Sequence, residues 1–195
     1  RNDIMPLSLA LIHYPVKDKC GNVAATSITN FDIHDLARTA RTYDVFRYYI
    51  VSPMPSQQKF AQRVIHHWNE GFGSQYNPSR GKALEIARVV GDLECVVDDL
   101  TIGSEGRPPV LIGTSARQMP HMITFQELRE RLKGEEGHYC LIFGTGWGLH
   151  PSLVEDLDCM LAPVQGLGGY NHLSVRAAVA IILDRLLGDR IEIPT

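Results

Sequence analysis

The sequence predicts an α/β domain with an open, largely parallel sheet and helices on both faces. Short apolar runs alternate along the chain with amphipathic stretches, as they do where crossover helices join parallel strands. We expect strands at Leu7–His13, Phe46–Val51, Val110–Gly113, Tyr139–Phe143 and Met160–Ala162. We expect helices that begin near Ile33, Gln57, Arg80, Asp92, Thr124 and Leu173.

Several helix ends carry capping signals. Asp32 is predicted to be the N-cap of the first helix, because a short acceptor side chain satisfies the first backbone amides. Thr124, followed three residues later by Glu127, fits a capping box. Gly188 follows two leucines, as a helix C-cap does. The stretch Asp92–Leu100 fits a helix or a strand, and apolar residues at helical spacing favour the helix.

Composition indicates one soluble globular domain, which we place at residues 5–190. The chain has 195 residues, of which 44% are hydrophobic and 21% charged. No apolar run is long enough to cross a bilayer, and no signal-peptide pattern is present at the start, so we expect a cytoplasmic protein without a membrane partner. The glycine-containing stretch from Gly71 is expected to be a loop inside this domain.

The cysteines do not suggest a metal site. Cys20, Cys95, Cys140 and Cys159 form no C-x-x-C pair, and each lies in or near an apolar run. Free thiols packed in a reducing compartment are the simpler interpretation, so we expect no zinc or other metal.

Charge is unevenly distributed along the chain. The formal net charge is −3, which does not by itself suggest nucleic acid. However, residues 38–88 contain eight Lys/Arg and three Asp/Glu, whereas residues 92–158 contain five Lys/Arg and twelve Asp/Glu. A basic half can attract phosphates even in an acidic protein, although solvated helix faces would also explain the pattern.

A glycine-bearing loop follows the strand predicted at Tyr139–Phe143. Gly144, Gly146 and Gly148 alternate in it, and glycine permits both positive φ and close approach of a ligand to the backbone. Because ligands of open α/β sheets bind beyond the carboxyl ends of strands, we expect a flat polar molecule there. A nicotinamide dinucleotide is disfavoured, because the third glycine comes one residue too early for G-x-G-x-x-G.

A second flexible segment, Pro163–Gly169, leads through Tyr170–Arg176 into a highly apolar helix. Residues Ala177–Leu183 are apolar or small, so this helix is expected to be buried nearly all round. A partner subunit and a central position in a monomer explain this pattern equally well.

The first predicted helix carries a third polar cluster. Asp35 and Arg38 are three residues apart and can pair on one face. Arg38 is either part of a weak surface ion pair or placed to meet a phosphate or ribose.

Basic and aromatic residues gather around the second predicted helix. His66, His67 and Trp68 are adjacent, and neighbouring positions do not share a helix face, which argues against a metal pair. Trp68 could stack a base, although core packing is its commoner role. The nearby cations suggest an RNA contact, and we take the candidate RNA-binding residues to be Arg38, Arg41, Lys59, Arg63, Arg80 and Lys82.

Together, the three segments resemble the three motifs of SPOUT-class (SpoU–TrmD) RNA methyltransferases. Gly144–Leu149 resembles the glycine loop of the second motif, and the stretch from Pro163 to Val175 resembles the third. The residues matching the first motif are Arg38, Thr39, Tyr43, Asp44 and Val45. Nearly the whole chain further resembles the small bacterial family found alone or fused to the tRNA guanine methyltransferase TrmD, through Tyr76-Asn77-Pro78, Thr114–Arg117 and Tyr170–Arg176.

Three positions depart from the SpoU pattern. Asp32 stands where the first motif usually has Asn, six residues before its Arg. Gly146 and Trp147 stand where the second motif usually has Glu, and His172 stands where the third has its catalytic-region Asn, although Asn171 is adjacent. With these departures the resemblance still implies a site for S-adenosyl-L-methionine (SAM), and the acceptor is either a ribose oxygen or a base nitrogen.

The resemblance implies a C-terminal trefoil knot that holds SAM, and a homodimer formed through the knot region. It also implies that Arg38 of one subunit completes the active site of the other. Arg38, Asp32, His172 and Asn171 are then the candidate catalytic residues. The cofactor contacts carried over by position are Thr114, Phe143, Gly144, Thr145, Gly146, Gly148, Val164, Gly166, Tyr170, Asn171 and Leu173.

The function expected from this resemblance is SAM-dependent 2′-O-methylation of tRNA ribose. Arg38 would bind the RNA phosphate and help to activate the hydroxyl, with His172 or Asp32 as the base. Two alternatives stay open: methylation of a base nitrogen in tRNA, and a catalytically silent module that binds SAM or RNA.

Overall fold

The computed structural model describes residues 7–119, 122–134 and 137–188, and residues 5–6 and 189–190 of the predicted domain lie outside these ranges. The strands are β1 (Leu7–Ile12), β2 (Val16–Lys17), β3 (Val23–Ala24), β4 (Tyr48–Val51), β5 (Ala87–Val90), β6 (Val110–Gly113), β7 (Met122–Ile123), β8 (Tyr139–Gly144) and β9 (Cys159–Leu161). The helices are α1 (Asn30–Thr42), α2 (Pro55–Asn69), α3 (Phe72–Tyr76), α4 (Pro78–Leu84), α5 (Leu93–Gly103), α6 (Phe125–Gly134), α7 (Pro151–Val154) and α8 (Val175–Leu187).

Seven described strands form one parallel sheet in the order β5-β4-β1-β8-β6-β9-β7, and β2 and β3 form a small antiparallel hairpin after β1. β1 and β8 pair over six residues, from Leu7 opposite Tyr139 to Ile12 opposite Gly144. The predicted α/β class with a parallel sheet is therefore confirmed.

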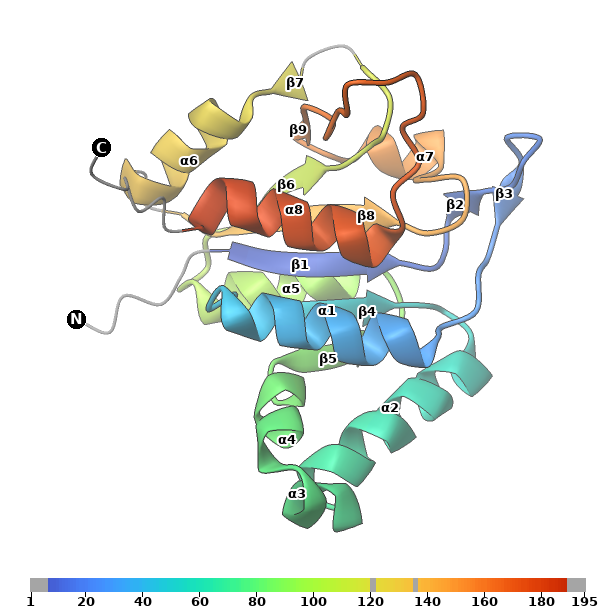
Figure 1. Cartoon of the computed structure of the whole chain (residues 1–195), viewed down its shortest axis with the longest axis vertical. Helices are drawn as coiled ribbons and strands as arrows, with labels where there is room; N and C mark the ends of the chain where they lie inside the picture. The colour runs from blue at the N-terminus through green and yellow to red at the C-terminus, as the bar shows by residue number, and fades with distance from the viewer. Residues whose placement is uncertain (1–6, 120–121, 135–136, 189–195) are drawn as a thin grey trace.

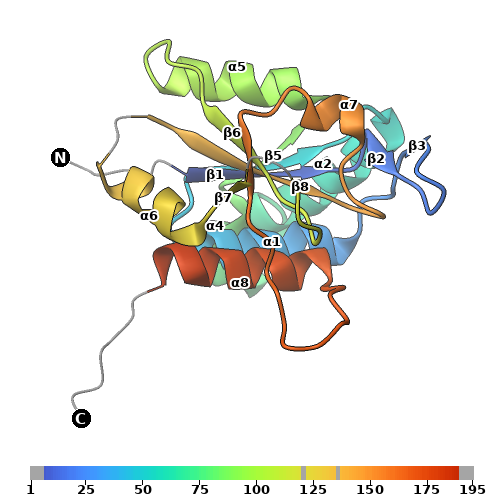
Figure 2. The same ribbon diagram turned by 90° about the horizontal axis from the view of Figure 1, so that it is seen from above.

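Helices cover both faces of this sheet (Figures 1 and 2). Seen from above, α5 and α7 lie on one face, and α1 and α8 lie side by side on the other. Each face has its own buried cluster: Val96, Leu100 and Leu153 pack on the α5 face, whereas Leu36, Val179 and Leu183 pack on the α1 face. Helices α2, α3 and α4 form an arm beyond the β4–β5 edge.

The five predicted strands are all present, with ends that differ by at most two residues. The four other described strands, β2, β3, β5 and β7, were not predicted. β5 follows directly after α4, and exposed Arg88 interrupts its apolar pattern. β2, β3 and β7 have two residues each, too few to show any periodicity. These short strands form only because neighbouring backbone is placed beside them.

The capping predictions have mixed outcomes. Thr124 and Glu127 form the predicted capping box, Asp92 caps a helix where helix was favoured over strand, and Gly188 is the C-cap of α8. Asp32 is not the N-cap of α1. That residue is Thr29, and Asp32 is the third helical residue, which returns a hydrogen bond to the cap.

The stretch from Gly71 is a short helix and not the predicted loop, because it packs against Trp68. A Cβ on Gly73 would lie 2.6 Å from the Trp68 ring, and one on Gly81 would lie 2.7 Å from the Trp68 carbonyl oxygen. Glycine at these two positions therefore lets α3 and α4 approach α2 closely. Both α3 and α4 thus pack closely against Trp68, which holds the arm together.

The apolar run Ala177–Leu183 predicted that helix α8 is buried nearly all round. Within one chain it is buried on one side only. Val179, Ile182, Leu183 and Leu186 are buried, whereas the intervening small residues are partly exposed. The trefoil knot implied by the resemblance stays a prediction. Among the described residues, no helix has the length and apolarity needed to cross a membrane.

The capping box of α1 gives a stability prediction. The Thr29 hydroxyl accepts from the Asp32 amide and donates to the Asp32 carboxylate. Thr29→Ala should lower the free energy of unfolding by about 1 kcal/mol, measured by urea denaturation. Thr42→Ala is the matched control at the other end of the helix, where the exposed hydroxyl only donates to the Arg38 carbonyl. Equal losses in both variants would contradict the capping role.

Candidate functional site

The segments of the second and third motifs, together with the turn at Thr114–Arg117, follow three neighbouring parallel strands. The glycine loop follows β8, the turn at Thr114–Arg117 follows β6, and the segment from Ala162 to Leu173 follows β9. Because β8, β6 and β9 are adjacent and parallel, all three segments leave the same edge of the sheet. The carboxyl edge of a parallel sheet is where ligands of this architecture bind.

The glycine loop is folded back on itself and braced by the β2–β3 hairpin. Gly146 and Gly148 have φ of 59° and 97°, which favours glycine at both. A Cβ on Gly144 would lie 2.6 Å from the Leu149 amide nitrogen, so Gly144 is required by the loop itself. On the hairpin side, the Trp147 amide donates to the Lys17 carbonyl at 3.2 Å.

Several loop amides are therefore already used inside the protein. Besides Trp147, the Thr145 amide donates to the Ile12 carbonyl and the Gly148 amide donates to the Thr145 carbonyl. The Thr145 and Gly148 carbonyls also accept hydrogen bonds inside the protein, so a ligand on this loop would meet mainly its open outer face, where Trp147 is 58% exposed.

A partly buried chain of hydrogen bonds, which the sequence did not predict, fixes the position of the glycine loop. His13 Nδ1 lies 3.0 Å from Thr26 Oγ1, which contacts Thr145 Oγ1, and Thr145 donates to the Ile12 carbonyl. Since each hydroxyl has one proton, Thr26 must donate to Thr145, and His13 Nδ1 must donate to Thr26. The network ties the start of the segment before α1 to the glycine loop.

His13 is fully buried in this network. Burial lowers the pKa of its ring, and the Asp32 carboxylate offsets this only in part, so the ring is neutral near pH 7. Its Nε2 is buried and has no hydrogen-bond partner among the described residues. The geometry therefore makes His13 a brace for the loop.

The segments after β6 and β9 are joined by one hydrogen bond. Asn171 Nδ2 donates to the Ala116 carbonyl at 2.9 Å. On the β6 side, the Thr114 hydroxyl is turned inward and donates to the Ile142 carbonyl. Tyr170 is 79% exposed, and its ring makes a T-shaped contact with the His172 ring at a centroid distance of 5.1 Å.

The other predicted cofactor residues differ in what they expose. The Phe143 side chain is 2% exposed and packs in the core, so only its backbone faces the edge. Val164 packs against the same core, whereas Leu173 is 45% exposed. Gly166 is exposed, and a Cβ there would meet no atom within 4 Å, which leaves open space beside it.

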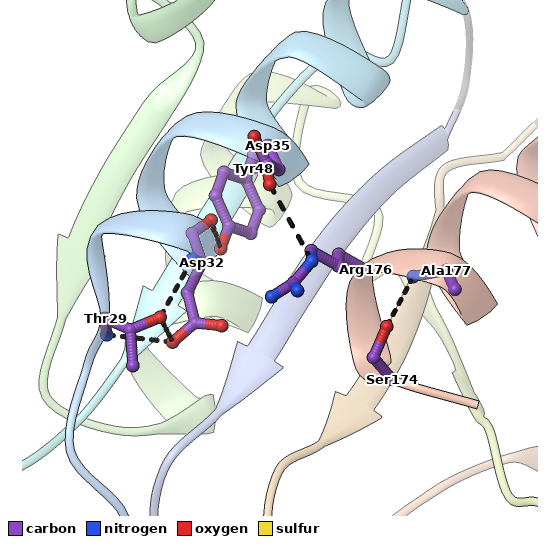
Figure 3. Close-up of polar contacts among 7 residues, drawn as sticks. All are labelled: Thr29, Asp32, Asp35, Tyr48, Ser174, Arg176 and Ala177. Carbon is purple, nitrogen blue, oxygen red and sulfur yellow. Dashed lines mark hydrogen bonds and ion pairs between the residues drawn. The ribbon is translucent and has the colours of Figure 1, made fainter. Parts of the chain in front are cut away.

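The N-termini of α1 and α8 lie side by side next to this edge (Figure 3). The fully buried Tyr48 hydroxyl donates to the Asp32 carbonyl and anchors the start of α1 on β4. The Asp32 carboxylate accepts from the Thr29 amide and hydroxyl at 2.9 and 2.8 Å. Its Oδ2 oxygen is therefore committed to the helix cap.

Of the two alternatives left open for Arg38, the ion pair with Asp35 does not form. Asp35 lies 3.8 Å from the Arg176 guanidinium on α8, and no ion pair with Arg38 occurs among the described residues. Arg176 also stacks over the Phe31 ring at 4.7 Å. Asp35 thus joins two helices, and Arg38 is left exposed on α1.

The predicted RNA-binding cations do not all lie together. Lys59 and Arg63 line an open groove between α1 and α2, whereas Arg80 stacks on Trp68 with its guanidinium carbon 4.6 Å from the ring centroid. Arg41 and Lys82 are exposed at the ends of α1 and α4. The sequence had no signal that His34 and Phe60 share the groove with Lys59 and Arg63.

The four cysteine thiols are free. Within residues 7–119, 122–134 and 137–188, no group of three His, Cys, Asp or Glu side chains is arranged to hold a metal ion.

Known proteins resemble this chain in sequence and in fold. An uncharacterized protein of Aquifex aeolicus is 42% identical over 178 residues, covering 91% of this chain and 86% of its own length. A tRNA (guanine-N(1)-)-methyltransferase of Nitratidesulfovibrio vulgaris is 43% identical over 183 residues, covering 94% of this chain. This chain spans only 42% of that relative's length.

Among solved structures, the SpoU methyltransferase AviRb of Streptomyces viridochromogenes, crystallised with AdoMet, matches with a TM-score of 0.57 at 16% identity. The match covers 98% of this chain and 62% of AviRb. The sheet of this chain therefore has the SPOUT methyltransferase fold. Residues 6–188 match the family described as SAM-dependent RNA methyltransferase. The chain accordingly belongs to this family of enzymes, and SAM is its methyl donor.

Proposed function

We propose that the segments after β8, β6 and β9 form the SAM pocket, and that the methyl group passes to the ribose 2′-hydroxyl of a tRNA. The observation that supports this proposal most is the order β8-β6-β9, which brings the second and third motif segments and the turn at Thr114–Arg117 to one edge. The pocket residues would be Thr114, Phe143, Gly144, Thr145, Gly146, Gly148, Val164, Gly166, Tyr170, Asn171 and Leu173.

The residues at this edge fit the cofactor. An adenosine needs flat apolar contacts together with backbone polar groups, and the edge offers the exposed side chains of Trp147, Tyr170 and Leu173 beside glycine-rich backbone. Since the Thr114 and Thr145 hydroxyls donate to inner carbonyls, these two residues would shape the pocket through backbone and methyl groups.

The chain's own residues would align the acceptor and take its proton. SAM supplies a methyl group on a sulfonium centre, which an acceptor oxygen or nitrogen displaces in line. Arg38 would hold the RNA phosphate and orient the hydroxyl, since orientation alone can lower such a barrier by several kcal/mol. Asn171 would fix the segment that carries the neighbouring His172 through its bond to Ala116.

His172 is favoured over Asp32 as the base. The Asp32 carboxylate is buried and uses Oδ2 in the helix cap, so proton transfer there would disturb α1. His172 is exposed on the segment that follows β9, and the imidazole of histidine accepts protons readily near neutral pH. Its ring makes a T-shaped contact with the Tyr170 ring, which would orient the imidazole.

A base nitrogen of tRNA is the second candidate acceptor. It is supported by the name of the Nitratidesulfovibrio relative, a tRNA (guanine-N(1)-)-methyltransferase. That name belongs to a protein more than twice as long as the matched region, however, so it does not assign the reaction to this part. The ribose proposal follows the likeness of the three motifs to SpoU enzymes.

The active form is proposed to be a homodimer of a single domain spanning residues 5–190. Helix α8 has an outer row of partly exposed residues, Ala177, Ala178 and Ile181. Two further apolar side chains are exposed: Phe31 in the first turn of α1 and Leu167 in the segment that leads to α8. A second copy seated on this apolar surface would bury it. Arg38 would then reach the pocket of the partner subunit. We propose that this dimer works in the cytoplasm.

The role of Arg38 can be tested by substitution. Arg38→Ala should leave SAM affinity unchanged by calorimetry and lower methyl transfer to tRNA about a hundredfold or more, because a contact to the reacting nucleotide is lost. Arg131→Ala on α6 removes the same charge away from the edge and should retain activity. Normal turnover of Arg38→Ala would refute the assignment.

The acceptor can be read from the product. RNA methylated with labelled SAM is hydrolysed in alkali, which requires a free 2′-hydroxyl at each cleaved linkage. Label on ribose should therefore appear in alkali-resistant dinucleotides on chromatography. Label in mononucleotides would instead identify a base nitrogen, and no incorporation despite SAM binding would indicate a silent module.

A further inference from the structure

An open groove of about 840 Å³ runs between α1 and α2, and no residue of the glycine loop lines it. This volume is within the range of small-molecule sites. One wall is the start of α1, and the other is made of two adjacent stripes of α2. The lining residues are Asn30, His34, Ser56, Lys59, Phe60, Arg63, Val64, His67 and Trp68.

The groove is positively charged and has no carboxylate in its lining. Lys59 and Arg63 are exposed, lie one turn apart on α2, and form no ion pair with another described residue. Burial and the charge of Arg80 lower the pKa of His34, so Lys59 and Arg63 carry the positive charge of the lining at neutral pH. Two adjacent cations without an acidic partner suit consecutive phosphates.

Cations continue from the groove toward the site proposed for transfer. Besides burial, the charges of Arg80 and Arg38 lower the pKa of His34, and the Asp35 carboxylate, which is shared with Arg176, raises it. Arg38 lies one helical turn after His34, so the two side chains share a face of α1. A chain of phosphates could therefore run from Lys59 and Arg63 past His34 to Arg38.

The groove also offers an aromatic surface. Phe60 is 38% exposed beside His34, His67 and Trp68. Trp68 has one ring face covered by Arg80 and is packed against α3 and α4, so it serves the arm's structure. No cation stacks on the Phe60 ring among the described residues, so this ring is open to a base. Because Phe60 is next to Lys59, a base stacked on Phe60 would have its phosphate close to that lysine.

We infer that this groove binds an unpaired nucleotide of the RNA substrate, with its base on Phe60 and its flanking phosphates on Lys59 and Arg63. The inference rests on the proposed function, because it assigns part of the substrate that the active edge would modify. A protein partner fits less well, because an acidic peptide would satisfy the cations and leave Phe60 without a stacking partner.

The test uses a short fluorescein-labelled oligouridylate and fluorescence anisotropy over a series of salt concentrations. Lys59→Ala/Arg63→Ala should weaken binding about tenfold or more and reduce the slope of log K against log salt by about 1.4, for two lost phosphate contacts. Phe60→Ala should weaken binding about fivefold or more and leave the slope unchanged.

Two matched variants test whether the effect belongs to the groove. Arg131→Ala/Lys133→Ala removes two positive charges from α6, which lies at the other end of the molecule from α2 (Figures 1 and 2). Phe72→Ala removes an exposed aromatic ring from the same arm but outside the groove. Both should bind oligouridylate nearly as the wild type does. Losses equal to those of the groove variants would overturn the inference.

The same proteins are titrated with SAM, which separates the two claims. The inference that the groove binds RNA would be overturned if the groove variants bound RNA as tightly as the wild type does. It would also be overturned if the wild type bound oligoglutamate as tightly as RNA. In either case, SAM binding and methyl transfer by the wild type would leave the proposed function standing. A folded wild-type protein that binds no SAM would overturn the proposed function and this inference with it.

Discussion

The position of β8 is the constraint on which the site depends. β8 is hydrogen-bonded to β1 as far as Gly144 and to β6 as far as Ile142, so two ladders hold its carboxyl end in place. Its neighbour β6 pairs in turn with β9. Three polar segments therefore emerge side by side from a rigid edge, and a pocket built on such an edge needs little reorganisation when a ligand arrives.

The glycine loop gains a second support from the segment before α1. The hydrogen bonds from His13 through Thr26 to Thr145 are partly buried, where polar contacts are stronger than in water. The chain continues from Thr26 to the Thr29 cap of α1, the helix that carries Arg38. The proposed cofactor loop and the proposed RNA-binding helix thus share one short stretch of backbone. This arrangement gives a physical reason why both should keep a defined relative position.

Much of the fold follows from local patterns, because each long buried strand has a continuous apolar run. The order of the strands does not, since it is decided by packing between distant segments. The choice of Asp32 over Thr29 as N-cap shows a local limit: both residue types cap helices, and only the backbone geometry separates the cap from the residue that answers it. Likewise, Lys59 and Arg63 were recognisable as cations on α2, but their position opposite His34 depends on how two helices pack.

The central claim is that SAM is held by the segments after β8, β6 and β9. Hydrogen–deuterium exchange with and without saturating S-adenosylhomocysteine tests this directly, because bound ligand slows local opening at its contacts. The account predicts slower exchange in residues 144–149, 114–117 and 163–173, with little change in α5 on the opposite face of the sheet. Unchanged exchange in all three segments, in protein shown to be folded, would contradict it.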